Sequence, residues 1–268
     1  MSLSEGRLAW RRLPWPIEVF SILCGYVAYS VIRVLAPDRV SASYANAWEL
    51  EAIEKSLGLF PELDLNAFLS RHSTLQDLAT YYYGTLHFVV TPLVLIWLWK
   101  RRASLYAPLR SSLVLASVAA LVVYATYPVA PPRFALAGTV DSVSLNPLAW
   151  DYGGHGVAGW INEFAAMPSL HVGWALWCAA AVVLVCRTPW RHLAWLYPLG
   201  TTLVVVATAN HYVLDAVGGA LIVLVPMLLC GLRFGPAEPP AVSEAAAVAG
   251  LPAQIPAPRE TAVRSGPA

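Results

Sequence analysis

Residues 163–186 read EFAAMPSLHVGWALWCAAAVVLVC, an apolar run with Pro168, Ser169 and His171 near its beginning. The run approaches the length of about 20 residues that a helix needs to cross the hydrocarbon core of a membrane. Proline suits the first position of a helix, because its missing N–H would have no partner there and its fixed φ fits the helix. We therefore predict a membrane-spanning helix that begins at Pro168 and carries His171 in its first turn.

The composition of the chain extends this prediction to the whole molecule. Apolar residues make up 58% of the 268 residues and charged residues only 12%, with a mean hydropathy of +0.58. Soluble domains contain about twice that share of charged residues. Six stretches are apolar and about long enough to cross a membrane: residues 16–36, 78–99, 110–128, 168–186, 193–209 and 212–232. The predicted fold class is an all-α polytopic membrane protein, a bundle of six transmembrane helices.

The remaining residues predict the domain organisation. Residues 37–77 mix charged residues with apolar residues at helical spacing, which is typical of an amphipathic helical segment lying in the membrane interface. Residues 235–268 are rich in Pro and Ala without an apolar period, which indicates a disordered cytoplasmic tail. Residues 1–15 form a cytoplasmic N-terminal segment, and we expect no cleavable signal peptide. The six-span membrane domain would comprise residues 16–234.

The basic residues predict the orientation, since they concentrate in cytoplasmic loops. If all six stretches cross, one side of the membrane receives Arg7, Arg11, Arg12, Lys100, Arg101, Arg102, Arg187, Arg191 and Arg233. Residues 37–77 and the loop 129–167 fall on the other side. We therefore expect a multi-pass protein of the cell membrane with both termini in the cytoplasm.

Polar residues at the outer ends of three spans need an explanation, because an ionised side chain at mid-bilayer costs about 2.5–3.5 kcal/mol. YPVAPPRF (127–134) follows the third span, MPSLH (167–171) opens the fourth and ANHYVLDAVGG (209–219) opens the sixth. With the predicted topology, all three motifs meet at the outer face of the membrane.

In MPSLH, the predicted helix start frees the backbone amides of Ser169, Leu170 and His171 at the positive end of the helix dipole. Such an end binds phosphate or another oxyanion. The Ser169 hydroxyl would add a donor, and His171 would face the anion. Taken alone, a histidine at a helix start is more often a capping or solvated residue.

In NHYVLD, His211 and Asp215 are four residues apart and share one helix face. A carboxylate that accepts the Nδ1 proton of a histidine fixes its tautomer and leaves Nε2 free as a nucleophile. A structural ion pair is the alternative interpretation. Gly218 and Gly219, one turn further, permit close helix packing.

Arg133 follows Pro131 and Pro132 in a stiff segment, where a guanidinium would grip phosphate oxygens with two hydrogen bonds. It would supply fixed positive charge for a phosphoryl group in transfer. The alternative is an arginine that anchors to lipid head groups.

His87 lies within the second span and is a candidate for lining a substrate site, with a neighbouring tyrosine beside it. The candidates are Tyr81, Tyr82 and Tyr83. Tyrosines of a membrane-interface belt are the alternative. His155 lies in a glycine-rich loop, where we expect either an exposed position or part of a lid. The four cysteines, all in apolar runs, predict packing rather than a metal site or disulfides.

The order of Arg133, PSLH (168–171) and NHYVLD (210–215) resembles the three motifs of the type 2 phosphatidic acid phosphatase superfamily, over roughly residues 75–230. The resemblance implies that His211 is the nucleophile, Asp215 its orienting residue and His171 the general acid. It implies a phosphohistidine intermediate that water or an alcohol breaks down. It implies neither a metal nor a cofactor.

The sequence departs from the phosphatase branch of that family at two positions. No Lys precedes Arg133 within reach, and Val205 stands six residues before His211, where that branch has Arg. The pattern looks more like the inositolphosphotransferase-like branch that contains inositol phosphorylceramide synthase and sphingomyelin synthase. Head-group transfer and a phosphatase with a reduced anion site both remain open.

The sequence therefore predicts an enzyme that cleaves a lipid phosphate ester or phosphodiester, through His211, His171 and Asp215, with Arg133, Ser169 and His87 binding the phosphate. Its partners would be a lipid phosphate or phospholipid and the membrane, with no nucleic acid. A non-enzymatic transporter or scaffold is the alternative, although we see no inverted repeat. A vanadate-dependent haloperoxidase is disfavoured by the missing cations.

Overall fold

The computed structural model describes residues 14, 16–20, 27, 39–144 and 163–232. The chain divides into two units, Met1–Arg233 and Phe234–Ala268, and every described residue belongs to the first. Several predictions lie outside the described residues: most of the N-terminal segment and of the first span, the loop that contains His155, and the tail 235–268.

The described residues form helices, with no strand other than an isolated bridge between Val129 and Ala165. The helices are α2 (Val40–Leu57), α3 (Glu62–Ser70), α4 (Ser73–Arg101), α5 (Ala103–Thr126), α6 (Pro132–Ala135), α7 (Leu170–Val185), η2 (Pro189–Trp195), α8 (Leu196–Ala207) and α9 (Val213–Leu229). The all-α part of the predicted fold class is confirmed.

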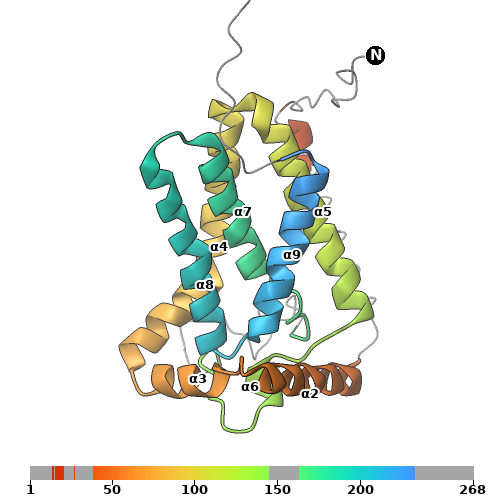
Figure 1. The fold of residues 1–268 in the computed structure, drawn as a ribbon, viewed down its shortest axis with the longest axis vertical. Coiled ribbons are helices and arrows are strands. Elements are labelled where there is room, and N and C mark those ends of the chain that lie inside the picture. Colours follow the sequence, from red (N-terminus) through yellow and green to blue (C-terminus); the bar gives the residue numbers. More distant parts are fainter. Residues whose placement is uncertain (1–13, 15, 21–26, 28–38, 145–162, 233–268) are drawn as a thin grey trace, which may run out of the picture. The chain divides into compact units, whose positions relative to one another are not determined.

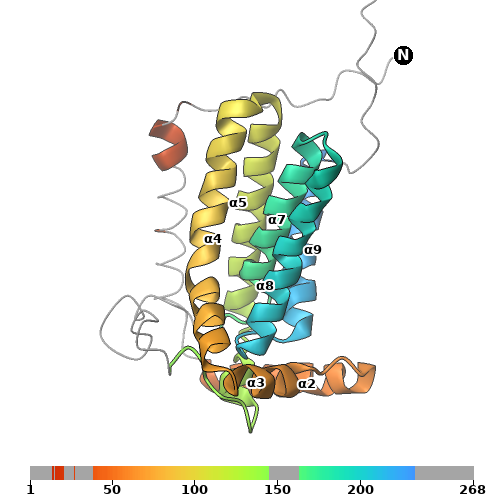
Figure 2. The same cartoon turned by 90° about the vertical axis from the view of Figure 1, so that its left-hand side faces the viewer.

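Five helices, α4, α5, α7, α8 and α9, run alongside one another, and α2 and α3 lie across one end of them (Figures 1 and 2). The helices α7 and α9 both begin at that end. The largest packing interfaces join α7 to α8 and α9, and α5 to α9. This arrangement places the three polar motifs of the sequence at the end of the bundle that α2 and α3 cover.

Two of the helices, α4 and α5, are long and apolar enough to cross a membrane by themselves. The helices α7 and α9 are shorter, with 16 and 17 residues, or about 24–26 Å against a hydrocarbon core of about 30 Å. The α-helical part of the predicted fifth span is shorter still. It begins at Leu196, because the seven residues of η2 before it form a 3₁₀ helix. The number of crossings therefore stays a prediction.

The outward faces of these helices are apolar. Exposed side chains on α4, α5, α8 and α9 include Phe88, Leu93, Ile96, Val114, Val118, Val122, Leu199, Leu203, Leu221, Val225 and Leu228. Soluble monomers seldom expose contiguous apolar surface on this scale. The surface matches the apolar solvent that a lipid bilayer provides and indicates a membrane protein.

The helices α7 and α9 cross with their backbones in contact. A Cβ atom on Gly219 would overlap the carbonyl oxygen of Ser169, and one on Gly173 would lie 2.9 Å from the carbonyl oxygen of Gly219. Gly218 has the side chain of Pro168 against it. The predicted close packing at Gly218 and Gly219 is therefore confirmed, and it brings the starts of the two helices together.

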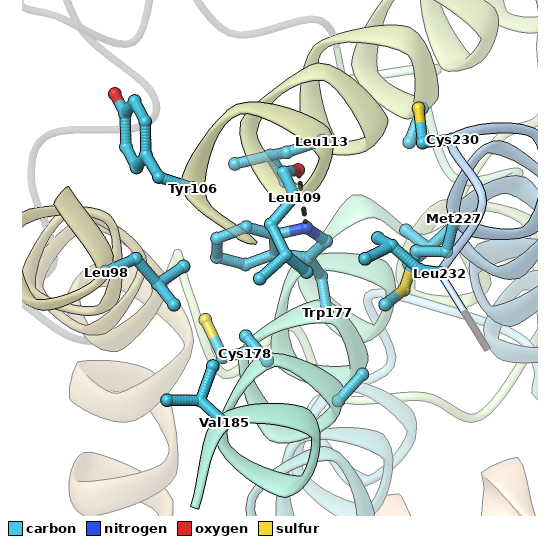
Figure 3. Close-up of a cluster of buried hydrophobic side chains, with 14 residues drawn as sticks. Leu98, Tyr106, Leu109, Leu113, Trp177, Cys178, Val185, Met227, Cys230 and Leu232 are labelled. Atoms are coloured by element: carbon cyan, nitrogen blue, oxygen red, sulfur yellow. Dashed lines mark hydrogen bonds between the residues drawn. The ribbon is translucent and has the colours of Figure 1, made fainter. Parts of the chain in front are cut away.

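Trp177 is the centre of the main apolar core, which α4, α5, α7 and α9 build (Figure 3). Its indole is fully buried, and Nε1 donates hydrogen bonds to the carbonyl oxygen of Leu109 at 3.0 Å and to Ser112 Oγ at 3.2 Å. Cys178 and Cys230 pack in the same cluster as free thiols, which is the packing role that the sequence predicts. The indole hydrogen bonds and the apolar contacts of this core tie α7 to α5.

Candidate active site

Three histidines from three parts of the chain come together where α7 and α9 begin. His171 lies in the first turn of α7, and its ring centre is 5.6 Å from that of His211, which directly precedes the start of α9. The ring of His87, on α4, lies edge-on to that of His171 with 4.4 Å between the centres. The structure thus brings together His87, His171 and His211, although His87 and His211 are 124 residues apart in the sequence.

The orientation of His211 is fixed by a backbone carbonyl. Its Nδ1 lies 2.8 Å from the carbonyl oxygen of Ala166 and 3.4 Å from Asp215 Oδ2. Since a carbonyl oxygen can only accept, Nδ1 carries the proton and Nε2 keeps its lone pair. The tautomer is the one predicted, but the nearer partner is Ala166, and Asp215 acts at longer range. A backbone carbonyl of an alanine gives no signal in the sequence.

Ala166 is itself held by the first motif. The amide of Ala166 donates to the carbonyl oxygen of Val129 at 3.2 Å, and the amide of Val129 donates to that of Phe164 at 2.9 Å. The next amide, of Ala130, donates to the carbonyl oxygen of Ser43 at 3.0 Å on α2. The segment before Arg133 therefore fixes the segment before Pro168, which in turn fixes His211.

The start of α7 corrects one prediction. The helix begins at Leu170 rather than Pro168, and Ser169 is its N-cap, with Oγ accepting from the amide of Val172 at 3.5 Å. The amide of Ser169 is not free, because it donates to the backbone carbonyl of Asp215 at 2.9 Å across the close α7–α9 crossing. Of the three amides predicted to face an anion, those of Leu170 and His171 remain.

The ring of His171 is enclosed by aromatic side chains. Tyr83 stacks on it, with 4.4 Å between the ring centres and 26° between the planes. The other two candidate tyrosines lie elsewhere: Tyr82 bonds Thr201 Oγ1 at 2.8 Å, and Tyr81 is exposed. Tyr83 and His87, four residues apart on α4, therefore both pack against the His171 ring.

The side chain of Arg133 is hydrogen-bonded to Asn210, the residue directly before His211. It lies in the short helix α6, where its amide donates to the carbonyl oxygen of Ala209 at 2.8 Å and its Nη1 donates to Asn210 Oδ1. Its Nε lies 3.6 Å from Asp141 Oδ2. The guanidinium is thus positioned by Asn210, while Asp141 balances part of its charge. The sequence singled out neither of these two partners.

The turn that presents His211 has a left-handed residue, Ala209, with φ of 54°. The amides of Asn210 and His211 both donate to the carbonyl oxygen of Val205, at 3.0 and 3.1 Å. Val205 is fully buried in an apolar cluster that includes Val172. The position at which the phosphatase branch has Arg therefore belongs to the core in this chain.

Among the residues that the structure describes, no group of three or more His, Cys, Asp or Glu side chains is arranged to hold a metal ion. The candidate site consists of histidines, one arginine, a carboxylate and the free amides at the start of α7. These groups are suited to bind an oxyanion and to transfer protons.

A sequence profile of the PAP2 superfamily matches residues 48–229, which is well over half of the chain and includes all the site residues described above except Ser43. Searches of the curated proteins and of the solved structures gave no match. The match supports a lipid phosphate-handling function, in agreement with the apolar helices of this chain. The chain belongs to the PAP2 superfamily.

Proposed function

We propose that this protein is a membrane-embedded phosphatase or phosphotransferase that cleaves a lipid phosphate ester or phosphodiester through a phosphohistidine at His211. The observation that carries the proposal is the hydrogen bond from Nδ1 of His211 to Ala166, which leaves the Nε2 lone pair free beside His171. A fixed tautomer with a second imidazole next to it is the arrangement that nucleophilic and acid catalysis on a phosphoryl group require.

In the first step, Nε2 of His211 attacks phosphorus and the bond from phosphorus to the leaving oxygen breaks. Protonated His171 gives its proton to that oxygen, and the bound anion favours the protonated ring before the step. Asp215, 3.4 Å from Nδ1, stabilises the positive charge that the His211 ring acquires.

In the second step, an oxygen of water or of a lipid alcohol attacks phosphorus. The bond between Nε2 and phosphorus breaks, Nε2 regains its lone pair, and the proton of the attacking hydroxyl passes to His171. Water as acceptor makes the enzyme a phosphatase, and a lipid alcohol makes it a transferase.

We propose that Arg133, His87 and the amides of Leu170 and His171 hold the phosphate oxygens. Ser169 is buried as the cap of α7, so its contribution is to shape the turn that presents these amides. Arg133 shares its charge with Asp141 and Val205 replaces a cation, so the site balances less negative charge than a monoester dianion carries. A phosphodiester, with one negative charge, suits such a site, which favours the inositolphosphotransferase-like branch.

We propose further that the helices of the bundle cross the membrane and that α2 and α3 lie in its interface. Lys100, Arg101, Arg187 and Arg191 lie in or beside the turns that connect α4 with α5 and α7 with α8, which are at the opposite end of the bundle from α2 and α3 (Figures 1 and 2). With basic residues on the cytoplasmic side, the site would open at the outer face of the membrane.

The test is transfer of labelled phosphate to the protein from phospholipid donors labelled at phosphorus, quenched within one turnover. Wild type should carry an acid-labile label, and His211→Ala should carry none. His192→Ala is the matched control, because His192 is exposed in η2, which connects α7 with α8 at the opposite end of the bundle from α2 and α3 (Figures 1 and 2). Absence of label and of any phosphorus-containing product in wild type would leave the transporter or scaffold interpretation.

The product separates the two activities. Donors are supplied with and without a lipid alcohol, and a new phospholipid demonstrates transfer, whereas free phosphate or a free head-group phosphate demonstrates hydrolysis. A monoester donor and a phosphodiester donor are compared at equal concentration. Preference for the monoester would contradict the proposal that this site, with Asp141 beside Arg133 and Val205 in place of a cation, is better suited to one negative charge than to two.

A further inference from the structure

The first turn of α9 is capped by carboxylates from three helices. Amides at a helix start have no partner within the helix. The amide of Tyr212 donates to Asp215 Oδ2 at 2.8 Å, that of Val213 to Glu62 Oε1 at 3.0 Å, and that of Leu214 to Glu54 Oε1 at 2.6 Å. Asp215 is local, but Glu62 and Glu54 are 151 and 160 residues away in sequence, on α3 and α2.

Both glutamates are completely buried, which is rare for a carboxylate. In each, the second oxygen, Oε2, is buried and accepts no hydrogen bond within the described structure. The two carboxyl groups lie close enough to interact by a hydrogen bond once one of them is protonated. A proton on one carboxyl group would therefore remove the repulsion between the two.

The charges around the pair favour that proton. Burial raises the pKa of Glu54 to about 8 and also raises the pKa of Glu62, and the repulsion of Asp215 adds to both shifts. Tyr212, the N-cap of α9, interacts electrostatically with these carboxylates and with Glu51 on α2, while His211 and Tyr127 interact with Asp215. Glu54 thus stays protonated at neutral pH, so two buried glutamates can lie beside Asp215.

We propose that Glu54 and Glu62 are positioning residues, which clamp the first turn of α9 and so hold His211 and Asp215 in register with His171. This inference rests on the function proposed above. His211 directly precedes the clamped residues, so a movement of that turn moves its ring. A displacement of about 1 Å at a reacting group can cost about 100-fold in rate.

The arrangement exceeds what helix capping alone requires. Asn, Ser or Thr caps a helix start without burying a charge, whereas a buried carboxylate carries a desolvation penalty of several kcal/mol. Here two such groups extend from helices outside the five-helix bundle to the one helix that follows the nucleophile. The clamp links α2 and α3, which cover the site end, directly to the reacting histidine.

The first experiment compares Glu54→Ala and Glu62→Ala with controls on the same helices, Ser56→Ala on α2 and Asp64→Ala on α3, both at exposed positions. We expect kcat to fall about 100-fold in the two clamp variants with KM within about twofold, and both constants to stay near wild type in the controls. Glu54→Gln should restore most of the activity, because its amide oxygen still accepts from Leu214 and it is neutral like the protonated acid.

The second experiment does not depend on activity. Hydrogen exchange of the amides of residues 212–214 should accelerate in Glu54→Ala and Glu62→Ala and stay at the wild-type rate in both controls. The pKa of Glu54 is raised in the fold, so it contributes stability at low pH that is lost as the pH rises from 4.5 to about 8. Glu54→Gln should lack this part of the pH dependence of unfolding. Wild-type kcat should decline as the pH rises past about 8, because Glu54 loses its proton, and the kcat of Glu54→Gln should not.

The outcomes separate the clamp from the proposed reaction. If wild type turns over no phosphate ester, the proposed function fails, and exchange with pH-dependent unfolding still decides whether the clamp exists. Wild-type exchange at residues 212–214 in the alanine variants, or faster exchange with unchanged kcat, would overturn the positioning role. If the alanine variants do not fold, Glu54→Asp takes their place, because it keeps the carboxyl group but shortens its reach. Wild-type exchange and wild-type kcat in Glu54→Asp would overturn the positioning role. The kcat of Glu54→Gln should exceed that of Glu54→Asp.

Discussion

The two ends of the bundle are built on different physical principles. Around Trp177, apolar side chains from four helices pack against one another, and van der Waals contact stabilises them. At the start of α7 and α9, hydrogen bonds join segments that are far apart in sequence: Ser43 to Ala130, Val129 to Ala166, Ala166 to His211 and Glu54 to Leu214. Stability and chemistry therefore have separate locations in this chain. The free energy of unfolding and kcat should respond to different substitutions.

The largest effect is expected at the site end, from His171→Ala. Loss of a general acid costs about 10²–10⁴-fold in rate, while loss of the stacking on Tyr83 should lower the free energy of unfolding by only about 0.5–1.5 kcal/mol. With a nitrophenyl ester, whose leaving group needs no proton, the loss should shrink to about 10-fold or less. The measurement is kcat on both substrates beside His72→Ala, an exposed control. Equal losses on both substrates would contradict the acid role.

Trp177→Ala should show the reverse pattern. Removing a buried indole costs about 3–5 kcal/mol of unfolding free energy, and kcat per folded molecule should stay near wild type. Trp190→Ala is the matched control, because that indole is 75% exposed, and its effect should stay within about 0.5 kcal/mol. Unfolding in detergent and titration of active molecules measure the two quantities. A fall in kcat per folded molecule would break the separation of the two ends.

Gly219→Ala tests the point where the two ends are connected. Its new methyl group would overlap the carbonyl oxygen of Ser169, so α7 and α9 must move apart. Overpacking costs about 1–3 kcal/mol, and this variant should lose both stability and kcat. The control is Gly200→Ala on α8, where the nearest atom to a Cβ is Tyr82 Oη at 3.7 Å. Wild-type values for Gly219→Ala in both assays would contradict the crossing described above.

The smallest effect is expected from Asp141→Asn. The substitution removes a carboxylate from beside Arg133 and leaves an oxygen to accept from the amides of Val143 and Ser144, which now bond Asp141 Oδ1. Both partners are partly exposed, so the change is below about 1 kcal/mol. KM for an anionic substrate should fall about two- to fivefold, against no change in Asp64→Asn. A higher KM would mean that Asp141 positions Arg133 rather than weakening it.

Much of the fold was predictable because apolar periodicity is a local signal. The stretches 78–99 and 110–128 lie largely within α4 and α5, and 212–232 contains α9. The site histidines were also predictable, since His171, His211 and Asp215 form short motifs with fixed spacing. Two helix starts were not. The start of α7 depends on a bond from Ser169 to Asp215, and that of α8 on a 3₁₀ helix before it.

The partners that position the site could not be predicted, because they act across the chain without a pattern. Glu54 and Glu62 fall among other charged residues in a stretch typical of an interfacial helix, and nothing local distinguishes them from exposed Asp64. Tyr83 was one of three candidate tyrosines and Asn210 belongs to the NHYVLD motif, but the sequence did not assign Tyr83 to His171 or Asn210 to Arg133. Ala166 gave no signal in the sequence.

The hydrogen bond that orients His211 is accepted by a main-chain carbonyl oxygen, so replacing side chains does not remove it. A scan that replaces side chains one at a time passes over Ala166, because the residue is already alanine and the group that matters is its carbonyl. The orienting oxygen is thus protected against ordinary point mutation and invisible to sequence comparison. It becomes accessible only through the main chain, for example with proline at position 166, which removes the amide that anchors this segment to Val129.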